Sequence, residues 1–427
     1  MANEDYFSRM MMMISKAAGK AIRSLRILLV GAGAAGNEIL KNLVLMGFGD
    51  KDLGGKITVN DIDIVEDSNL SKSVLFTKED IGKSKAEVAA KRAAEMALVD
   101  NPDIRYINAN VMTDVGKGVF LDHDFVICAV DTQKARAYIN DMCVLTKTPF
   151  MEVGFTGFNA DVSFFAPVGP MQQADGTIID KLPTTDGKFP KMLGEFPVCL
   201  REEIGTGSFD EKRNSCSGFK VKDNDLAKIP TIQTSAALTG AIVAQELVKY
   251  LDGKDTLRNK MLYFFGLPLQ TMLIEYTRRS DCTIHDEKFN LATVPVPKNV
   301  GIGQALSAIE SQLGGTALLI LPDEFILSGT CHCCGEKVQI NARSKEVWDD
   351  QRWCDNCRET YPDYTSRIFY TSNYEIVPKE VSLNLPKSVL DMKLQEIGVP
   401  ENDILDCIIL TEGEPEYYNV YLKTEQI

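Results

Sequence analysis

The chain has 427 residues, which is too long for one small hydrophobic core, so two or three domains are expected. Its net charge of −14 argues against general nucleic-acid binding, and no apolar run reaches the roughly 18 residues that span a bilayer. The N-terminus does not read as a secretory signal. The eleven cysteines therefore predict a reducing, cytoplasmic location, where thiols are structural groups, metal ligands or nucleophiles.

Strand-like and helix-like segments alternate along the first third of the chain. Amphipathic or Ala-rich helices are expected over 36–47 and 84–99. Buried strands are expected over 25–30, 57–60, 104–108, 124–130 and within 149–167. This alternation predicts an α/β fold with a Rossmann-like, doubly wound and mainly parallel sheet that carries helices on both faces.

The pattern changes after this first part. Residues 168–229 are rich in Gly, Pro, Asp, Lys and Ser, which is typical of an inserted or crossover region. A helix is expected over 231–251, a strand over 261–265 and a linker over 282–300. The remainder predicts a cysteine cluster and an α+β tail, with a helix, a loop and two strands over 387–423.

A glycine-rich turn lies between the first strand and the first long helix. Gly31, Gly33 and Gly36 form G-x-G-x-x-G, a pattern that brings phosphates to a helix N-terminus but is weak when it stands alone. Asp61 ends the second strand and could hold the ribose hydroxyls of either NAD or ATP.

The residues after Asp61 favour a triphosphate. Asn69, Lys72 and Lys85 follow in order, and a hydride-transfer site has no need for two lysines and an amide there. Several phosphate oxygens do need neutralisation, and a magnesium ion needs a carboxylate such as Asp131. The sequence therefore predicts an ATP–Mg²⁺ site.

These elements together resemble the ubiquitin-activating enzyme family, which includes the adenylyltransferases of sulfur-carrier proteins. The shared string is G-x-G-x-x-G, D-x-D-x-V-x-x-S-N-L, D-I-G-K-S-K-A and D-x-x-x-x-R, and the resemblance runs from about Asp5 to Glu287. It implies an acyl-adenylating enzyme, in which a C-terminal carboxylate attacks the α-phosphate of ATP and pyrophosphate leaves.

The resemblance also implies roles for single residues. Asp61, with Asp63 beside it, would hold the ribose; Asn69, Lys72 and Lys85 would contact the triphosphate; Asp131 would hold Mg²⁺, and Arg136 fills the arginine place of D-x-x-x-x-R. Arg9 matches an arginine that homodimers of this family lend to the neighbouring protomer's site. Lys72 stands where the family has arginine, so the charge is kept but the bidentate fork is lost.

Two cysteines are candidates for a thioester-forming nucleophile. Cys199 lies in FPVCLRE, which resembles the stretch F-P-x-C-T-[IL]-R around the catalytic cysteine of thioester-forming relatives, although Leu200 replaces the threonine and Arg201 comes one residue early. Nearby cations, Lys191 and Arg201, would favour the thiolate. Cys216 is the second candidate.

Zinc is expected in the C-terminal region rather than in the crossover region. Cys331-x-x-Cys334-Gly and Cys354-x-x-Cys357 predict two knuckles of a closed, tetrahedral zinc site, with Cys333 as a spectator that could replace a ligand. Sulfur-carrier adenylyltransferases pair two C-x-x-C motifs around the crossover. Here the first pair is missing and the second place reads Cys282-Thr-Ile-His285, so no zinc site is favoured there.

The favoured organisation has five parts. They are an N-terminal helix (1–24), two parts of an adenylation domain (25–167 and 230–287) around a crossover and catalytic-cysteine region (168–229), and a zinc-ribbon-containing region with a possible docking role (288–427).

The favoured function is activation of a ubiquitin-like protein with a C-terminal glycine by a homodimer, through adenylation, a thioester on Cys199 and transfer to a conjugating enzyme. The alternatives are a sulfur-carrier adenylyltransferase without an enzyme thioester, a peptide- or tRNA-modifying relative, and a catalytically impaired scaffold.

Overall fold

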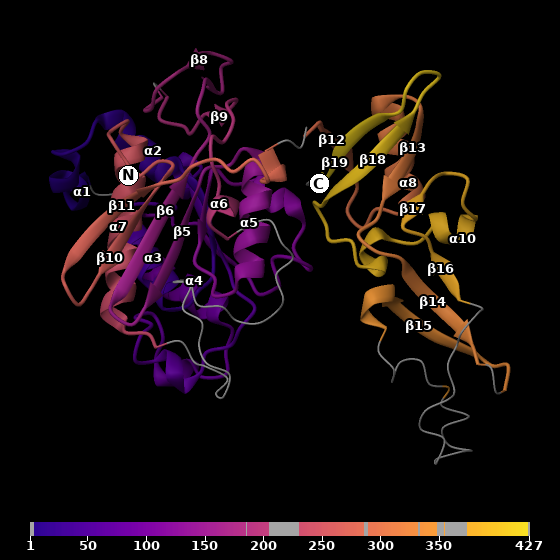
Figure 1. The fold of residues 1–427 in the computed structure, drawn as a ribbon, viewed down its shortest axis with the longest axis horizontal. Helices are drawn as coiled ribbons and strands as arrows, with labels where there is room; N and C mark the ends of the chain where they lie inside the picture. Colours follow the sequence, from indigo (N-terminus) through magenta and orange to yellow (C-terminus); the bar gives the residue numbers. More distant parts are fainter. Residues whose placement is uncertain are drawn as a thin grey trace. The chain divides into compact units, whose positions relative to one another are not determined.

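The chain forms two compact units, which the computed structural model describes over residues 4–184, 186–204, 230–285, 289–331, 334–347, 354 and 374–425. The first unit contains residues 1–113 and 119–287, and the second contains residues 114–118 and 288–427. Figure 1 traces the chain through both units. Among the described helices, none is both long and apolar enough to cross a bilayer.

An eight-stranded sheet organises the first unit, in the order β11-β10-β6-β5-β4-β1-β2-β3. The run from β3 to β5 is parallel, whereas β6, β10 and β11 pair antiparallel. The strands are β1 (Arg26–Val30), β2 (Lys56–Asn60), β3 (Ile104–Ile107), β4 (Phe125–Cys128), β5 (Phe150–Thr156), β6 (Asn159–Phe165), β10 (Lys260–Phe265) and β11 (Gln270–Glu275). The helices are α1 (Glu4–Met11), α2 (Lys16–Ser24), α3 (Ala34–Leu45), α4 (Lys85–Met96), α5 (Gln133–Thr146), α6 (Arg201–Ile204) and α7 (Gln233–Leu251).

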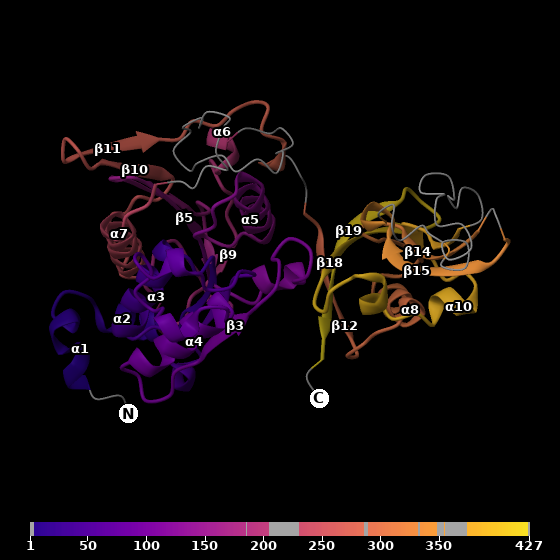
Figure 2. The ribbon, with the colours of Figure 1, turned by 90° about the horizontal axis from the view of Figure 1, so that it is seen from below.

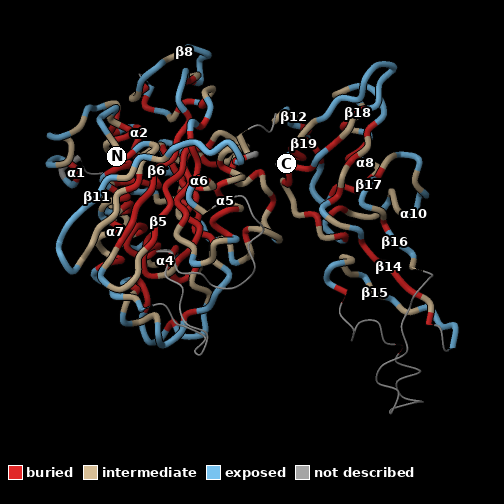
Figure 3. Tube along the Cα trace, in the orientation of Figure 1, coloured by how far each residue is buried: buried red, intermediate tan, exposed pale blue. Residues whose placement is uncertain are grey.

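The central strand β1 is apolar from Ile27 to Val30 because both of its faces are covered there. Ile27 and Leu29 pack into one core with residues of α3, α4 and α7, whereas Leu28 and Val30 pack into a second core with residues of α5. Figure 2 shows α3 and α7 on one side of the sheet and α5 on the other. The burial colours of Figure 3 mark the inner strands as the most buried part of this unit. The predicted α/β fold with a mostly parallel sheet is confirmed.

The N-terminal part and the crossover region are more divided than the sequence pattern suggests. The single helix expected over 1–24 is split into α1 and α2, because the Ser15 hydroxyl accepts a hydrogen bond from the Ala18 N–H and caps α2. The crossover region contains a small sheet of β7 (Met171–Gln172), β8 (Ile178–Ile179) and β9 (Lys191–Met192).

The second unit is built on a five-stranded sheet in the order β12-β19-β18-β13-β17, with α8 packed against it. A three-stranded sheet, β15-β14-β16, belongs to the same unit. The elements are β12 (Leu291–Val296), α8 (Ile302–Leu313), β13 (Thr316–Ile320), β14 (Phe325–Thr330), β15 (Lys337–Arg343), β16 (Glu375–Val377), β17 (Glu380–Val381), α10 (Lys387–Leu390), β18 (Ile404–Leu410) and β19 (Glu416–Thr424). The linker expected over 282–300 is wrong over 291–296, because these residues form β12 and pair in parallel with β19.

Candidate active site

The glycine-rich turn joins β1 to α3 and has an open outer side. Gly31 has a φ of +101°, and a Cβ there would lie 2.3 Å from the carbonyl oxygen of Ala129. A Cβ on Gly36 would lie 2.0 Å from the carbonyl oxygen of Gly31, whereas a Cβ on Gly33 would have no atom within 4 Å. Gly31 and Gly36 therefore shape the turn, and Gly33 leaves the N-terminus of α3 accessible to phosphates.

Asp61 ties the end of β2 to this turn. One carboxylate oxygen accepts a hydrogen bond from the Ala32 N–H at 2.7 Å, and the other accepts one from the Asp63 N–H at 2.8 Å. Burial raises the pKa of Asp61, although the two backbone donors and Lys85 act in the opposite direction. The geometry places this carboxylate beside the glycine turn, where a ribose-binding acid is expected.

Lys85, at the start of α4, contacts the segment that follows β2. Its Nζ lies 2.8 Å from the carboxylate of Asp63, and the Lys85 side chain is 13% exposed whereas that of Asp63 is 62% exposed. The Lys85 N–H also donates to the Asp63 carbonyl oxygen at 2.9 Å. The structure therefore brings together Asp61, Asp63 and Lys85 from the predicted set.

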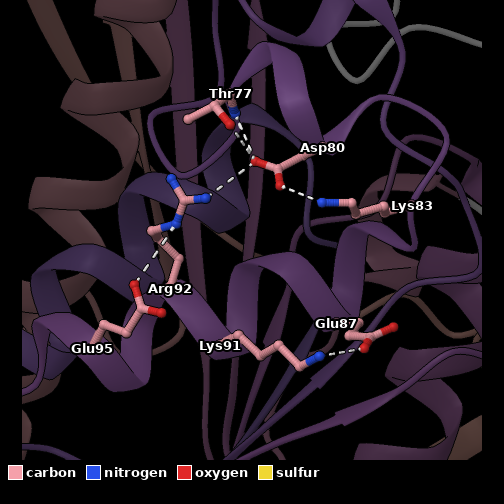
Figure 4. Close-up of polar contacts among 7 residues, drawn as sticks. All are labelled: Thr77, Asp80, Lys83, Glu87, Lys91, Arg92 and Glu95. Carbon is pink, nitrogen blue, oxygen red and sulfur yellow. Dashed lines mark hydrogen bonds and ion pairs between the residues drawn. The ribbon is translucent and has the colours of Figure 1, made fainter.

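A buried carboxylate, Asp80, fixes the segment that leads into α4. It accepts hydrogen bonds from the N–H and the hydroxyl of Thr77 at 2.9 and 2.8 Å, and it pairs with Arg92 at 3.2 Å and Lys83 at 3.4 Å (Figure 4). Because Arg92 lies on α4 itself, Asp80 connects the preceding loop to the helix that carries Lys85.

Asn69 and Lys72 lie on the loop between β2 and α4. The Asn69 side-chain oxygen accepts a hydrogen bond from the Glu66 N–H at 2.9 Å and stabilises the 3-10 helix η2 (Asp67–Asn69). The Lys72 Nζ donates to the Thr231 hydroxyl at 3.1 Å, and Thr231 forms a bridge with Gly157, directly after β5. Lys72 therefore lies beside the segment that leads into α7, and its contact with a triphosphate stays a prediction.

Asp131 and Arg136 have contrasting surroundings. Asp131 is exposed shortly after β4, the neighbour of β1. Arg136 is 5% exposed, donates to the carbonyl oxygens of Val130 and Val153, and forms an ion pair with Glu152. These contacts do not favour the predicted binding of a nucleotide by Arg136; they instead hold the backbone next to Asp131.

Arg9 is exposed on α1, while Phe7 of the same helix is buried near Gly47. A role in the site of a neighbouring protomer requires a second copy of the chain, so that role stays a prediction.

A cluster of potential metal ligands forms around Cys199. One donor atom each from Cys199, Glu202, Cys282 and His285 lies within 4.8 Å of the others. The two sulfur atoms are 3.8 Å apart, and the His285 Nε2 lies 3.2 Å from a Glu202 carboxylate oxygen. Two thiols, an imidazole and a carboxylate suit Zn²⁺. The sequence did not favour a zinc site around Cys282 and His285; the fold adds Cys199 and Glu202 as further possible ligands, so zinc binding here is a new hypothesis.

The surroundings of Cys199 do not favour its predicted role as a nucleophile. The residue is fully buried, and burial together with the neighbouring Cys282 raises the pKa of its thiol to about 12. Arg201, which was expected to favour the thiolate, pairs with Asp141 at 2.5 Å. A buried thiol cannot reach an acyl group unless the chain rearranges. The second candidate, Cys216, lies outside the described residues.

Three of the four predicted zinc ligands of the C-terminal region come together. Donor atoms of Cys331, Cys334 and Cys354 lie within 4.8 Å of one another, with 3.6 Å between the sulfur atoms of Cys334 and Cys354. Gly335 has a φ of +75°, and its N–H donates to the Cys331 carbonyl oxygen at 2.8 Å, which is the tight turn expected of a knuckle. Cys357 lies outside the described residues, as does Cys333.

Glu202 is the functional candidate that sequence reasoning missed. Its signal is the spacing Cys199-x-x-Glu202, which places two donors one turn apart and repeats the spacing of Cys282-x-x-His285. The two pairs are far apart in the sequence, so only the fold shows that they meet.

Comparisons with known proteins find similar sequences among activating enzymes. Over 160 residues (36% of this chain and 15% of the relative), the chain is 36% identical to ubiquitin-activating enzyme E1 1 of Candida albicans (strain WO-1). It is 38% identical over 152 residues (34% and 14%) to ubiquitin-like modifier-activating enzyme 7 of Homo sapiens, and 33% identical over 160 residues (37% and 23%) to SUMO-activating enzyme subunit 2 of Dictyostelium discoideum. The chain thus spans less than a quarter of the length of each of these relatives.

Among solved structures, that of E. coli MccB with AMPCPP and MccA matches over 67% of this chain and 75% of that chain, with 16% sequence identity and a TM-score of 0.49. The model of the ThiF family matches residues 7–284, which include the glycine turn, Asp61, Lys85 and Asp131. Because this match covers more than half of the chain, the protein belongs to the ThiF family.

Proposed function

We propose that this chain activates the C-terminal carboxylate of a ubiquitin-like protein by ATP-dependent adenylation. The observation that carries the proposal is that Gly31, Asp61 and Asp131 follow three adjacent parallel strands, and that Lys85 is held near Asp61 by its ion pair with Asp63. The names of the relatives, which activate ubiquitin, SUMO and other ubiquitin-like modifiers, support the choice of substrate class.

The chemistry requires little beyond positioning and charge neutralisation. A carboxylate oxygen of the substrate attacks the α-phosphorus of ATP, the bond from that phosphorus to the bridging oxygen breaks, and pyrophosphate leaves with the electron pair. The N–H groups at the start of α3 and the ammonium groups of Lys72 and Lys85 would neutralise phosphate oxygens. Asp131, an exposed carboxylate at this edge, suits Mg²⁺, which would offset charge on the leaving pyrophosphate.

Lys85→Ala is expected to weaken ATP binding and to slow ATP–pyrophosphate exchange by roughly 100-fold, because a charge directed at the phosphates is lost. Calorimetry with ATP–Mg²⁺ measures the first effect, and exchange in the presence of ubiquitin or SUMO measures the second. Lys91→Ala is the matched control, since Lys91 lies on the same helix but pairs with Glu87 at the surface. If the unmodified chain binds no ATP, the proposal fails and the scaffold alternative is favoured.

A thioester on Cys199, followed by transfer to a conjugating enzyme, would be a finer part of this function, and it excludes zinc binding by Cys199 because one thiolate cannot serve both roles. A dithiothreitol-sensitive adduct that disappears in Cys199→Ser but persists in Cys216→Ser would support the original assignment. The burial of Cys199 instead favours the alternative in which an adenylate forms without a thioester on this residue. ATP–pyrophosphate exchange without any thiol-sensitive adduct would support that alternative.

The proposed homodimer, in which Arg9 of one protomer reaches the site of the other, is tested by measuring the molecular mass of the protein in solution.

We also propose that both cysteine clusters bind zinc, with about one ion in each. Metal analysis of the purified chain should then find about two zinc ions, and Cys282→Ser and Cys334→Ser should each remove about one. Cys407→Ser is the control, because Cys407 is a buried thiol of β18 outside both clusters. Unchanged zinc content in Cys282→Ser would refute the crossover site, whatever the result for Cys334→Ser.

A further inference from the structure

An acidic pocket of about 460 Å³ lies on the sheet of the first unit, beside β6, β10 and β11. Its acidic residues are Asp161, Glu203, Glu275 and Glu202, the last of which also belongs to the cluster around Cys199. Tyr263, Ile274 and Tyr276 are part of its wall. Asp161 and Tyr263 are directly paired across β6 and β10, so their side chains share one face of the sheet.

The carboxylates of the acidic pocket differ in their hydrogen-bond and ion-pair partners. Glu203 accepts a hydrogen bond from the Tyr276 hydroxyl at 3.0 Å, and Glu275 pairs with Lys260 at 2.7 Å. Asp161 is 5% exposed, lines the pocket, and has no hydrogen-bond partner among the residues that the structure describes. A carboxylate this deeply buried needs a compensating partner.

The described residues supply Asp161 with little positive charge. Arg136 attracts it, but the Arg136 guanidinium already pairs with Glu152 and donates to two backbone carbonyl oxygens. Burial raises the pKa of Asp161 to about 7. Because the Asp161 carboxylate has lost hydration without gaining a hydrogen-bond donor from the described residues, a cation bound in the pocket would stabilise its charged form.

We propose that the acidic pocket binds a lysine or arginine side chain of the protein whose carboxylate is activated, an inference that rests on the proposed function. Tyr263 and Ile274 offer an apolar surface to the hydrocarbon stem, and Asp161 offers an unpartnered acceptor to the charged end. The pocket also lies near the candidate ATP site. The Arg136 guanidinium attracts the Asp161 carboxylate and donates a hydrogen bond to the carbonyl oxygen of Val130, the residue before Asp131.

The test uses the full chain and Nα-acetyl-arginine methylamide, whose blocked ends mimic a residue within a protein. In a titration followed by ligand-observed NMR, the arginine probe should bind, whereas the citrulline analogue, which is uncharged, should bind at least tenfold more weakly. Asp161→Asn should weaken binding of the arginine probe at least tenfold. Equal binding of the two probes, or an effect of Asp161→Asn below twofold, would overturn the inference.

Glu203→Gln is a second variant that guards against misfolding, because the amide oxygen can still accept the Tyr276 hydrogen bond while the charge is lost. Glu203→Gln should weaken binding of the arginine probe severalfold. Glu275→Gln should weaken this binding less than Asp161→Asn or Glu203→Gln does, because the Glu275 carboxylate already pairs with Lys260. Putrescine binding as tightly as the arginine probe would assign the pocket to a free amine and overturn the inference. ATP binding is measured separately on the same samples, so its absence would contradict the proposed function alone.

Discussion

Gly36→Ala is expected to destabilise the first unit by roughly 3 kcal/mol and to abolish ATP binding. The added Cβ would lie 2.0 Å from the carbonyl oxygen of Gly31, and this neighbour is backbone at the end of β1 rather than the end of a flexible side chain. Either α3 or the turn must therefore shift. Urea denaturation followed by circular dichroism measures the stability, and calorimetry with ATP–Mg²⁺ measures the binding.

Gly33→Ala is the matched comparison, since the two glycines are three residues apart in one turn. A Cβ at Gly33 would meet no atom within 4 Å, so the loss of stability should stay below about 1 kcal/mol, although ATP affinity should fall at least tenfold. The methyl group would occupy the space through which phosphates approach α3. Normal ATP binding by Gly33→Ala would show that the nucleotide does not bind at this turn.

Arg136→Met is expected to destabilise the chain by about 3 to 5 kcal/mol, because it leaves Glu152 charged and unpaired in the interior. The double variant Arg136→Met/Glu152→Met removes both charges and should recover most of that loss. Urea denaturation of the two single variants and the double variant provides the measurement.

The double variant also separates two roles of Arg136. If the arginine only holds the backbone beside Asp131, the refolded double variant should bind ATP within about tenfold of the unmodified chain. A loss as large as that in Lys85→Ala, with stability restored, would instead assign Arg136 a direct contact with the nucleotide and restore the role that the D-x-x-x-x-R element implies.

The sequence by itself determined the fold class and the order of the nucleotide-binding elements. These depend on local signals: the continuous apolar run of β1 requires burial on both faces, and the glycine spacing requires a tight strand-to-helix turn. Asp61 could be placed for the same reason, since it directly follows a strand adjacent to β1. The knuckle of Cys331 and Cys334 was also predictable, because both ligands lie in one short turn.

Only the tertiary structure decided which charged groups have partners and which thiols are buried, because both properties depend on residues distant in the sequence. Arg136 matches a family element, yet its buried contacts with Glu152 and Val153 arise from the packing of α5 against β5. Cys199 resembles a nucleophile in its local sequence, yet the fold buries it beside Cys282, which lies 83 residues further along the chain. A local pattern specifies which chemical groups are present, whereas the fold determines their exposure and their neighbours, and these set their chemistry.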